Sequence, residues 1–167
     1  MARIAPRFAS TRMQKDYFDK YYAPMESRLA MLRADGNKAL YDLVAWKQHM
    51  LSNWGTVQAI RVERVDAGEQ QVVTGNEYTE RVLLDTGKID PQYIGVEEVI
   101  SELQPGRTEV QIQSTQQFKL VGQDGHRAEY EVVLRPTSPG MYERAIRIFA
   151  THPLLPHRMD FCLVRWI

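Results

Sequence analysis

The sequence contains a single cysteine, Cys162, and no long apolar run. One cysteine excludes an internal disulfide, and no CxxC motif or Cys/His cluster offers a structural metal site. No stretch of about 18 consecutive apolar residues exists, so no transmembrane helix is expected. Met1–Ser10 is short and lacks the apolar region of a secretory signal peptide. These absences predict a cytoplasmic protein without a membrane partner.

An excess of either charge is also missing, because 21 Lys and Arg residues balance 21 Asp and Glu residues. A chain with zero net charge has no overall bias toward nucleic acid or anionic membranes, so neither is expected as a partner. The balance hides an asymmetry. Residues 1–54 carry nine Lys/Arg against five Asp/Glu, and residues 55–167 carry twelve against sixteen. A positive part followed by a negative part indicates two units with different neighbours.

Catalytic motifs are missing as well, since the sequence has no GxGxxG, no P-loop and no GxSxG. His152 and His157 have no nearby Cys or carboxylate partner, and we interpret them as loop histidines rather than as a metal site. We interpret Cys162 as a small apolar strand residue rather than as a nucleophile. The sequence therefore predicts no catalytic residue, no cofactor-binding residue and no metal ligand.

Glu97 and Glu98 are the remaining candidates for acid/base chemistry. Adjacent residues in a strand face opposite sides of the sheet, so these two do not form a recognisable acid/base pair. The pattern favours a solvated location for both carboxylates.

Residues 1–54 show helical periodicity after an expected extended arm at Met1–Ser10. Ser10 or Thr11 can cap a helix that carries a wide, aromatic apolar face. Pro24 should kink this helix or restart it with Pro24 at the first position. We expect the aromatic face to be an interface, and its predicted residues are Arg12, Tyr17, Phe18, Tyr21, Tyr22 and Met25.

A second helix is predicted from about Lys38 to Ser52, after a stop at Asp35-Gly36-Asn37. Two amphipathic helices joined by a short turn predict an α-helical hairpin. Two helices alone cannot cover both apolar stripes. Part of the aromatic face should therefore pack on the β-domain, on another copy of the chain, or on a domain outside it.

After Trp54-Gly55 the periodicity becomes that of strands, which predicts a helical segment at 1–54 and a β-domain at 55–167. About seven short strands separated by turns predict an immunoglobulin-like antiparallel β-sandwich, so the fold class is mostly β with the helical hairpin in front. The segment Ile94–Leu103 fits either a bulged strand or a helical turn. The clearer strands are expected at Thr56–Val65 with a bulge near Ile60, Tyr78–Thr86, Val110 through Phe118 to Leu120, Arg127–Arg135, Tyr142–Ala150 and Asp160–Trp166.

Two turns carry specific expectations. Asp124-Gly125 predicts a two-residue hairpin of type I′, in which both central residues need positive φ. Tyr142, after Gly140-Met141, has the spacing of a tyrosine corner. Its hydroxyl should therefore bond back to the preceding turn.

Two separated stretches resemble the C-terminal end of bacterial α-glucan (glycogen or maltodextrin) phosphorylases of the longer, divergent type. They are PRFASTRMQKDYFDKYYAP at Pro6–Pro24 and THPLLPHRMDFCLVRWI at Thr151–Ile167. Between them, in register, lie Ala45-Trp46-Lys47 with Trp54, the segment LDTGKIDPQYIGVEEV, and the turn before Tyr142. The resemblance covers nearly the whole chain, and its motifs are packing motifs rather than catalytic ones.

The resemblance implies a parent enzyme that uses pyridoxal phosphate to cleave α-1,4-glucan with inorganic phosphate, releasing glucose 1-phosphate. The glycine-rich segment and the lysine that hold this cofactor in the family lie upstream of the region resembled. This chain is therefore expected to be a non-catalytic, bracing part that is inactive alone, with the upstream catalytic lobes as its partner. Trp166-Ile167 would be a docked terminus. The lysines that match no cofactor motif are Lys15, Lys20, Lys38, Lys47, Lys88 and Lys119.

Other interpretations remain open from the sequence. The chain can be a standalone β-sandwich that binds a glycan, such as an α-glucan, or a protein partner. The aromatic helix can also mediate self-association, because so apolar a face is costly to leave in water. A small independent enzyme would need a cleft with a perturbed acid or a nucleophile, which the sequence does not supply.

Overall fold

The computed structural model describes residues 10–65, 74–102, 111–140 and 142–167. Apart from Ser10, the expected N-terminal arm lies outside these residues. The chain divides into two compact units, a helical unit at 1–46 and a β-rich unit at 47–167. The domain boundary predicted at Trp54-Gly55 stays a prediction.

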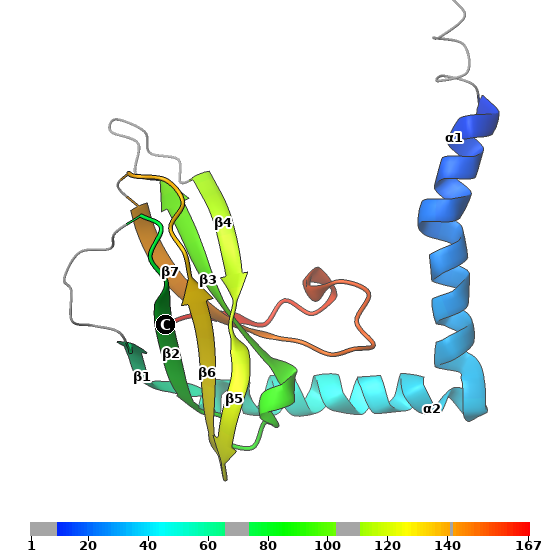
Figure 1. Ribbon diagram of the computed structural model, residues 1–167. Helices are drawn as coiled ribbons and strands as arrows, with labels where there is room; N and C mark the ends of the chain where they lie inside the picture. Colours follow the sequence, from blue (N-terminus) through cyan, green and yellow to red (C-terminus); the bar gives the residue numbers. More distant parts are fainter. Residues whose placement is uncertain (1–9, 66–73, 103–110, 141) are drawn as a thin grey trace, which may run out of the picture. The chain divides into compact units, whose positions relative to one another are not determined.

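The helical unit begins with α1 (Ser10–Tyr17), one π-helical segment η2 (Phe18–Tyr22), and the start of α2 (Ala23–Asn53) (Figure 1). The backbone stays helical across both junctions, with φ/ψ of −67°/−42° at Tyr17 and −62°/−44° at Ala23. The predicted restart with Pro24 at the first position is wrong, because Ala23 begins α2. The alternative, a kink at Pro24, stays a prediction. A proline has no N–H and its ring crowds the carbonyl four residues earlier. The wider π turn, in which the Ala23 N–H bonds to the Phe18 carbonyl, accommodates it.

The predicted stop at Asp35-Gly36-Asn37 is confirmed. These three residues have φ values of 50°, 67° and 68°, in the left-handed region, and Ala34 before them has an extended ψ of 157°. Glycine adopts positive φ freely, and Asp and Asn tolerate it better than other residues. The element α2 therefore consists of two helical segments joined by this turn. That they pack on each other as a hairpin stays a prediction.

The β-rich unit contains, within the described residues, two antiparallel sheets of four strands each. The first sheet has the order β1-β2-β6-β5 and the second has the order β4-β3-β7-β8. The mostly β fold preceded by helix is confirmed. The strands are β1 (Gln58–Arg64), β2 (Tyr78–Asp85), β3 (Ile94–Glu102), β4 (Gln111–Gln117), β5 (Lys119–Asp124), β6 (Arg127–Leu134), β7 (Tyr142–Ala150) and β8 (Val164–Trp166). The short helical turns of this unit are η3 (Trp54–Thr56), η4 (Pro91–Tyr93) and η5 (Arg158–Asp160).

In β2 and β6 the core follows from alternation, because one face of these strands is covered. The first six residues of β3 are all buried, so both faces of this strand are covered there. The strand β6 buries every second residue, as predicted, and β2 does the same. The predicted bulge near Ile60 is confirmed by a register shift between Ala59 and Arg61. The segment that fitted strand or helix is the strand β3, and its Leu103 lies outside the described residues. Core side chains include Tyr78, Val82, Leu84, Val96, Ala128, Tyr130, Val132, Leu134, Ile146 and Ile148.

The predicted single strand from Val110 to Leu120 is wrong. Its residues form β4 in one sheet and β5 in the other, and Figure 1 shows the chain continuing from β4 into β5. Phe118 lies between them, is only 4% exposed, and donates its N–H to the Val96 carbonyl at 2.9 Å. Ile112 and Leu120, expected on the same face as Phe118, are instead 55% and 42% exposed. The chain changes sheets at Phe118, which sequence alternation alone cannot show.

The turns and the C-terminal strand differ in detail from expectation. Asp124 pairs with Arg127, so the two central turn residues are Gly125 and His126. Among the described residues only Gly125 of this pair has positive φ, at 59°, which is the pattern of a type II′ turn rather than type I′. The Tyr142 hydroxyl donates to the Ser138 carbonyl at 3.4 Å, which confirms the predicted tyrosine-corner bond, although Met141 lies outside the described residues.

The last predicted strand, Asp160–Trp166, is wrong in extent. Only Val164–Trp166 pairs with β7, while Arg158–Asp160 forms the helical turn η5. His157 Nδ1 accepts from the Met159 N–H, and the Asp160 carboxylate accepts from the His157 N–H. This capping box at the start of the turn overrides the strand pattern. No helix in the described ranges is long and apolar enough to cross a membrane.

Candidate functional site

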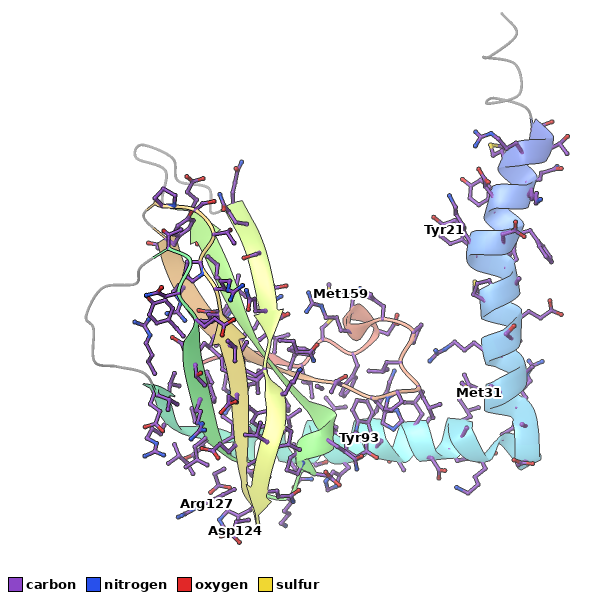
Figure 2. All side chains as sticks on the ribbon, in the orientation of Figure 1. Tyr21, Met31, Tyr93, Asp124, Arg127 and Met159 are labelled. Carbon is purple, nitrogen blue, oxygen red and sulfur yellow. The ribbon has the colours of Figure 1, made fainter. Side chains whose placement is uncertain are left out.

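The aromatic stripe of the helical unit, defined as Tyr17, Phe18, Tyr21, Tyr22 and Met25, lies open on the surface. Its side chains range from 49% exposed at Tyr17 to 66% exposed at Met25. Figure 2 shows the Tyr21 side chain projecting from the helix. An exposed apolar set of this size on one element is typical of an interaction surface. The role of this stripe as an interface stays a prediction.

The π turn shapes the stripe. The Tyr17 and Tyr21 rings lie with centroids 5.7 Å apart and planes tilted by 39°, within the range in which aromatic rings attract each other. Arg12, the polar member of the predicted interface, pairs with Asp16 one turn away at 2.8 Å. An open hollow of about 600 Å³ is lined by Thr11, Gln14, Lys15, Tyr17, Phe18 and Tyr22.

The prediction that Glu97 and Glu98 are solvated is wrong. They lie in the middle of β3 and are 4% and 0% exposed. Their predicted placement on opposite sides of the sheet is confirmed, because each makes contacts with a different set of arginines. A buried carboxylate is stable only when it is paired or protonated, so these arginines make the burial of the two glutamates tolerable.

The Glu98 cluster joins the two sheets. Arg144 of β7 donates to one carboxylate oxygen of Glu98, and the same guanidinium reaches Glu80 of β2, in the other sheet, at 2.5 Å. Arg64 of β1 lies 3.5 Å from the second oxygen of Glu80. Burial raises the pKa of Glu98, with Arg144 acting in the opposite direction. Among the described residues no donor reaches the Oε2 atom of Glu98.

The Glu97 cluster lies on the other face of the second sheet. Arg147, directly opposite on β7, donates to Glu97, and Arg158 of η5 reaches both carboxylate oxygens at 2.7 and 2.9 Å. Arg158 also lies over the Phe149 ring, 5.6 Å from its centroid. Arg147 lies 5.5 Å from the centroid of Trp166. One buried carboxylate thus fastens the segment before β8 to the sheet.

A sequence signal for these two clusters exists. Glu97-Glu98 interrupts an apolar run between Val96 and Val99, which is unusual for a solvated pair. The strand β7 carries arginines at positions 144 and 147, an odd spacing that places one on each face. Matching one arginine to each glutamate would have predicted the two clusters.

The two loop histidines are held by their own backbone. His152 Nδ1 accepts from the Leu154 N–H and His157 Nδ1 accepts from the Met159 N–H, each at 3.1 Å. His152 also stacks on Tyr93 with ring centroids 5.2 Å apart, and burial lowers the pKa of His152. In the portion of the chain that the structure describes, no three His, Cys, Asp or Glu side chains are grouped to hold a metal ion.

Cys162 is not the strand residue that the sequence suggested. It is exposed, precedes β8, and its thiol donates to the Met159 carbonyl at 2.9 Å. The described side chains that are both charged and buried belong to the two glutamate clusters. The ion pairs of these clusters link neighbouring strands and fasten η5 to β3.

Comparison with known proteins identifies the family of the chain. The model of the glycogen phosphorylase C-terminal domain family matches residues 54–167. The chain is 26% identical over 166 residues to the maltodextrin phosphorylase of Thermococcus litoralis, covering 98% of this chain and 19% of that protein. The chain thus spans about a fifth of the length of this relative. The resemblance seen in the sequence is confirmed: the chain belongs to the glycogen phosphorylase C-terminal domain family.

Proposed function

We propose that the chain is a non-catalytic C-terminal region of an α-glucan phosphorylase that braces the preceding catalytic lobes. The observation that carries the proposal is the exposed aromatic stripe of the helical unit. The chain covers only 19% of its maltodextrin phosphorylase relative, so a parent enzyme of that kind would supply further polypeptide for the stripe to contact. The parent enzyme would cleave α-1,4-glucan by phosphorolysis and release glucose 1-phosphate.

The stripe supports a bracing role through the free energy of its burial. Burying apolar surface contributes roughly 25 cal/mol per Å², so covering the exposed half or more of these five side chains favours contact with a partner surface. Tyrosines suit such a surface because the ring packs while the hydroxyl finds a polar partner. In this proposal the preceding lobes of the same polypeptide cover the stripe.

The lysines of this chain do not fit pyridoxal phosphate. All six lie in the described residues, and none is buried. Lys38 pairs with Asp42 at 2.6 Å, and Lys47 lies 5.5 Å from the centroid of the Phe161 ring. A cofactor lysine needs an enclosed site that lowers its pKa or excludes water. We therefore propose that the preceding lobes hold the cofactor and carry out the catalytic step, and that residues 1–167 take no part in the reaction.

A direct assay tests the non-catalytic role. The purified chain, mixed with maltodextrin, inorganic phosphate and pyridoxal phosphate, should release no glucose 1-phosphate and should not take up the cofactor. Stoichiometric cofactor uptake, seen by absorbance, or product release would overturn the proposal.

The same sample tests the alternative of a glycan-binding module. Trp46 and Trp54 are 8% and 7% exposed, whereas Trp166 is 55% exposed, so a fluorescence change on adding maltoheptaose would report chiefly on Trp166. We expect no saturable change, because bracing requires no glucan site here. A saturable change that is abolished by Trp166→Ala would favour the glycan-binding module.

A further inference from the structure

The C-terminal end of α2 is embedded in the β-rich unit. Met50 and Val57 are fully buried and Trp54 is 7% exposed. The helix nevertheless has no basic residue in its last turn. The carbonyls at a helix C-terminus carry partial negative charge and lack intrahelical partners, so a cation placed there is stabilising.

Arg165 of β8, more than a hundred residues away in sequence, places a cation at the turn that directly follows α2. Its guanidinium donates to the Val57 carbonyl and, at 3.3 Å, to the Trp54 carbonyl. Trp54 begins η3, the turn directly after α2. A guanidinium can hold two acceptors at once because its donors form a rigid, planar fork.

Two further contacts reinforce this end of the helix. The Lys47 ammonium lies 5.5 Å from the centroid of Phe161, and His49 Nε2 lies 3.0 Å from the Lys88 carbonyl. Phe161 and Arg165 both belong to the last seven residues of the sequence. That segment is itself fixed to β7, since the Ile167 N–H donates to the Ile146 carbonyl at 2.9 Å.

We propose that residues 161–167, here named the C-terminal clasp, fasten the end of α2 to the sandwich, with Arg165 as the positioning residue. The firmness of this attachment then depends on the last strand as well as on the buried residues of the helix. The proposal stands whether or not the chain works within a phosphorylase. It goes beyond the bracing role, because it names the segment that attaches the end of α2 to the β-rich unit.

Hydrogen exchange of the amides at 50–57 tests the clasp. Losing hydrogen bonds from a charged donor should speed their exchange by about tenfold or more in Arg165→Ala. Arg127→Ala, at the exposed tip of the β5-β6 hairpin in Figure 2, is the matched control and should leave these amides unchanged. Equal exchange at 50–57 in Arg165→Ala and in the control would overturn the proposal.

A distance measurement separates local attachment from general loosening. Nitroxide labels at Leu51→Cys and Asp124→Cys, in a Cys162→Ser background, both lie in the β-rich unit. One narrow distance distribution is expected, and Arg165→Ala should broaden it. An unchanged distribution contradicts the clasp. If Arg165→Ala does not fold, Arg165→Lys takes its place. Lysine keeps the charge but presents a point donor, so faster exchange at 50–57 supports the clasp and unchanged exchange overturns it.

Discussion

Replacing Arg144 with alanine should lower the free energy of unfolding by about 3–5 kcal/mol, because removing one partner leaves buried carboxylates without compensation. Glu98 is 0% exposed and Glu80 is 6% exposed, and Arg144 bridges the two across the sheets. Urea unfolding followed by fluorescence measures the loss. Arg81→Ala is the matched control, since its pair with Glu131 at 2.8 Å is more exposed and should cost less than about 1 kcal/mol.

The deficit of Arg144→Ala should depend on pH with a definite sign. Burial raises the pKa of Glu98 above its ordinary 4.5, and removing Arg144 removes an opposing effect. A carboxyl with a raised folded-state pKa contributes stability below its ordinary pKa, and this is lost as pH rises through the folded pKa. The deficit should therefore grow as the pH rises above the ordinary pKa of 4.5 and through the raised pKa of the folded state. A deficit that is small or independent of pH would show that the cluster does not hold the sheets together.

Replacing Gly95 with alanine should cost about 1–3 kcal/mol, because the new methyl group overpacks a filled site. A Cβ at this position of β3 would lie 2.4 Å from Cζ of Phe149, on the neighbouring strand. The Phe149 ring is 8% exposed and has Arg158 over it, so it has little room to move.

Thermal unfolding provides the comparison for Gly95→Ala. Gly122→Ala is the control, since a Cβ on this other strand glycine would meet its nearest neighbour, Glu129, at an ordinary 3.7 Å. Replacing the ring with the smaller leucine side chain, in the double variant Gly95→Ala/Phe149→Leu, should recover part of the lost stability. Equal midpoints for Gly95→Ala and Gly122→Ala would mean that Phe149 does not pack over β3 as described.

Much of the fold could be predicted from local pattern. The strict alternation of β6 and the stop at Asp35-Gly36-Asn37 express backbone geometry that neighbouring residues decide, and both are confirmed. The passage from β4 to β5 could not be predicted in this way. The strand β4 pairs with β3 in one sheet, and β5 pairs with β6 in the other. These partners are distant in sequence, so the local pattern does not show that the chain changes sheets.

The site was harder to predict, because its partners are distant in sequence. Glu98 is held by Arg144 and Glu97 by Arg158, which are 46 and 61 positions away. A charged residue in isolation favours solvent, and only the pairing reverses that preference. The aromatic stripe needed no partner to be recognised, because helical spacing alone gathers its residues. Because helical spacing reports only on neighbouring residues, it does not identify the surface that would pack against the stripe.

The central claim is that the aromatic stripe packs on the lobes that precede this chain. Hydroxyl-radical footprinting read by mass spectrometry tests it, comparing the chain alone, at a concentration where it is monomeric, with the same residues in the full-length phosphorylase. Oxidation of Tyr17, Phe18, Tyr21 and Tyr22 should fall severalfold in the full-length protein, while oxidation of Leu120 at the edge of the first sheet should not change. Equal oxidation of the stripe in both samples would contradict the bracing role.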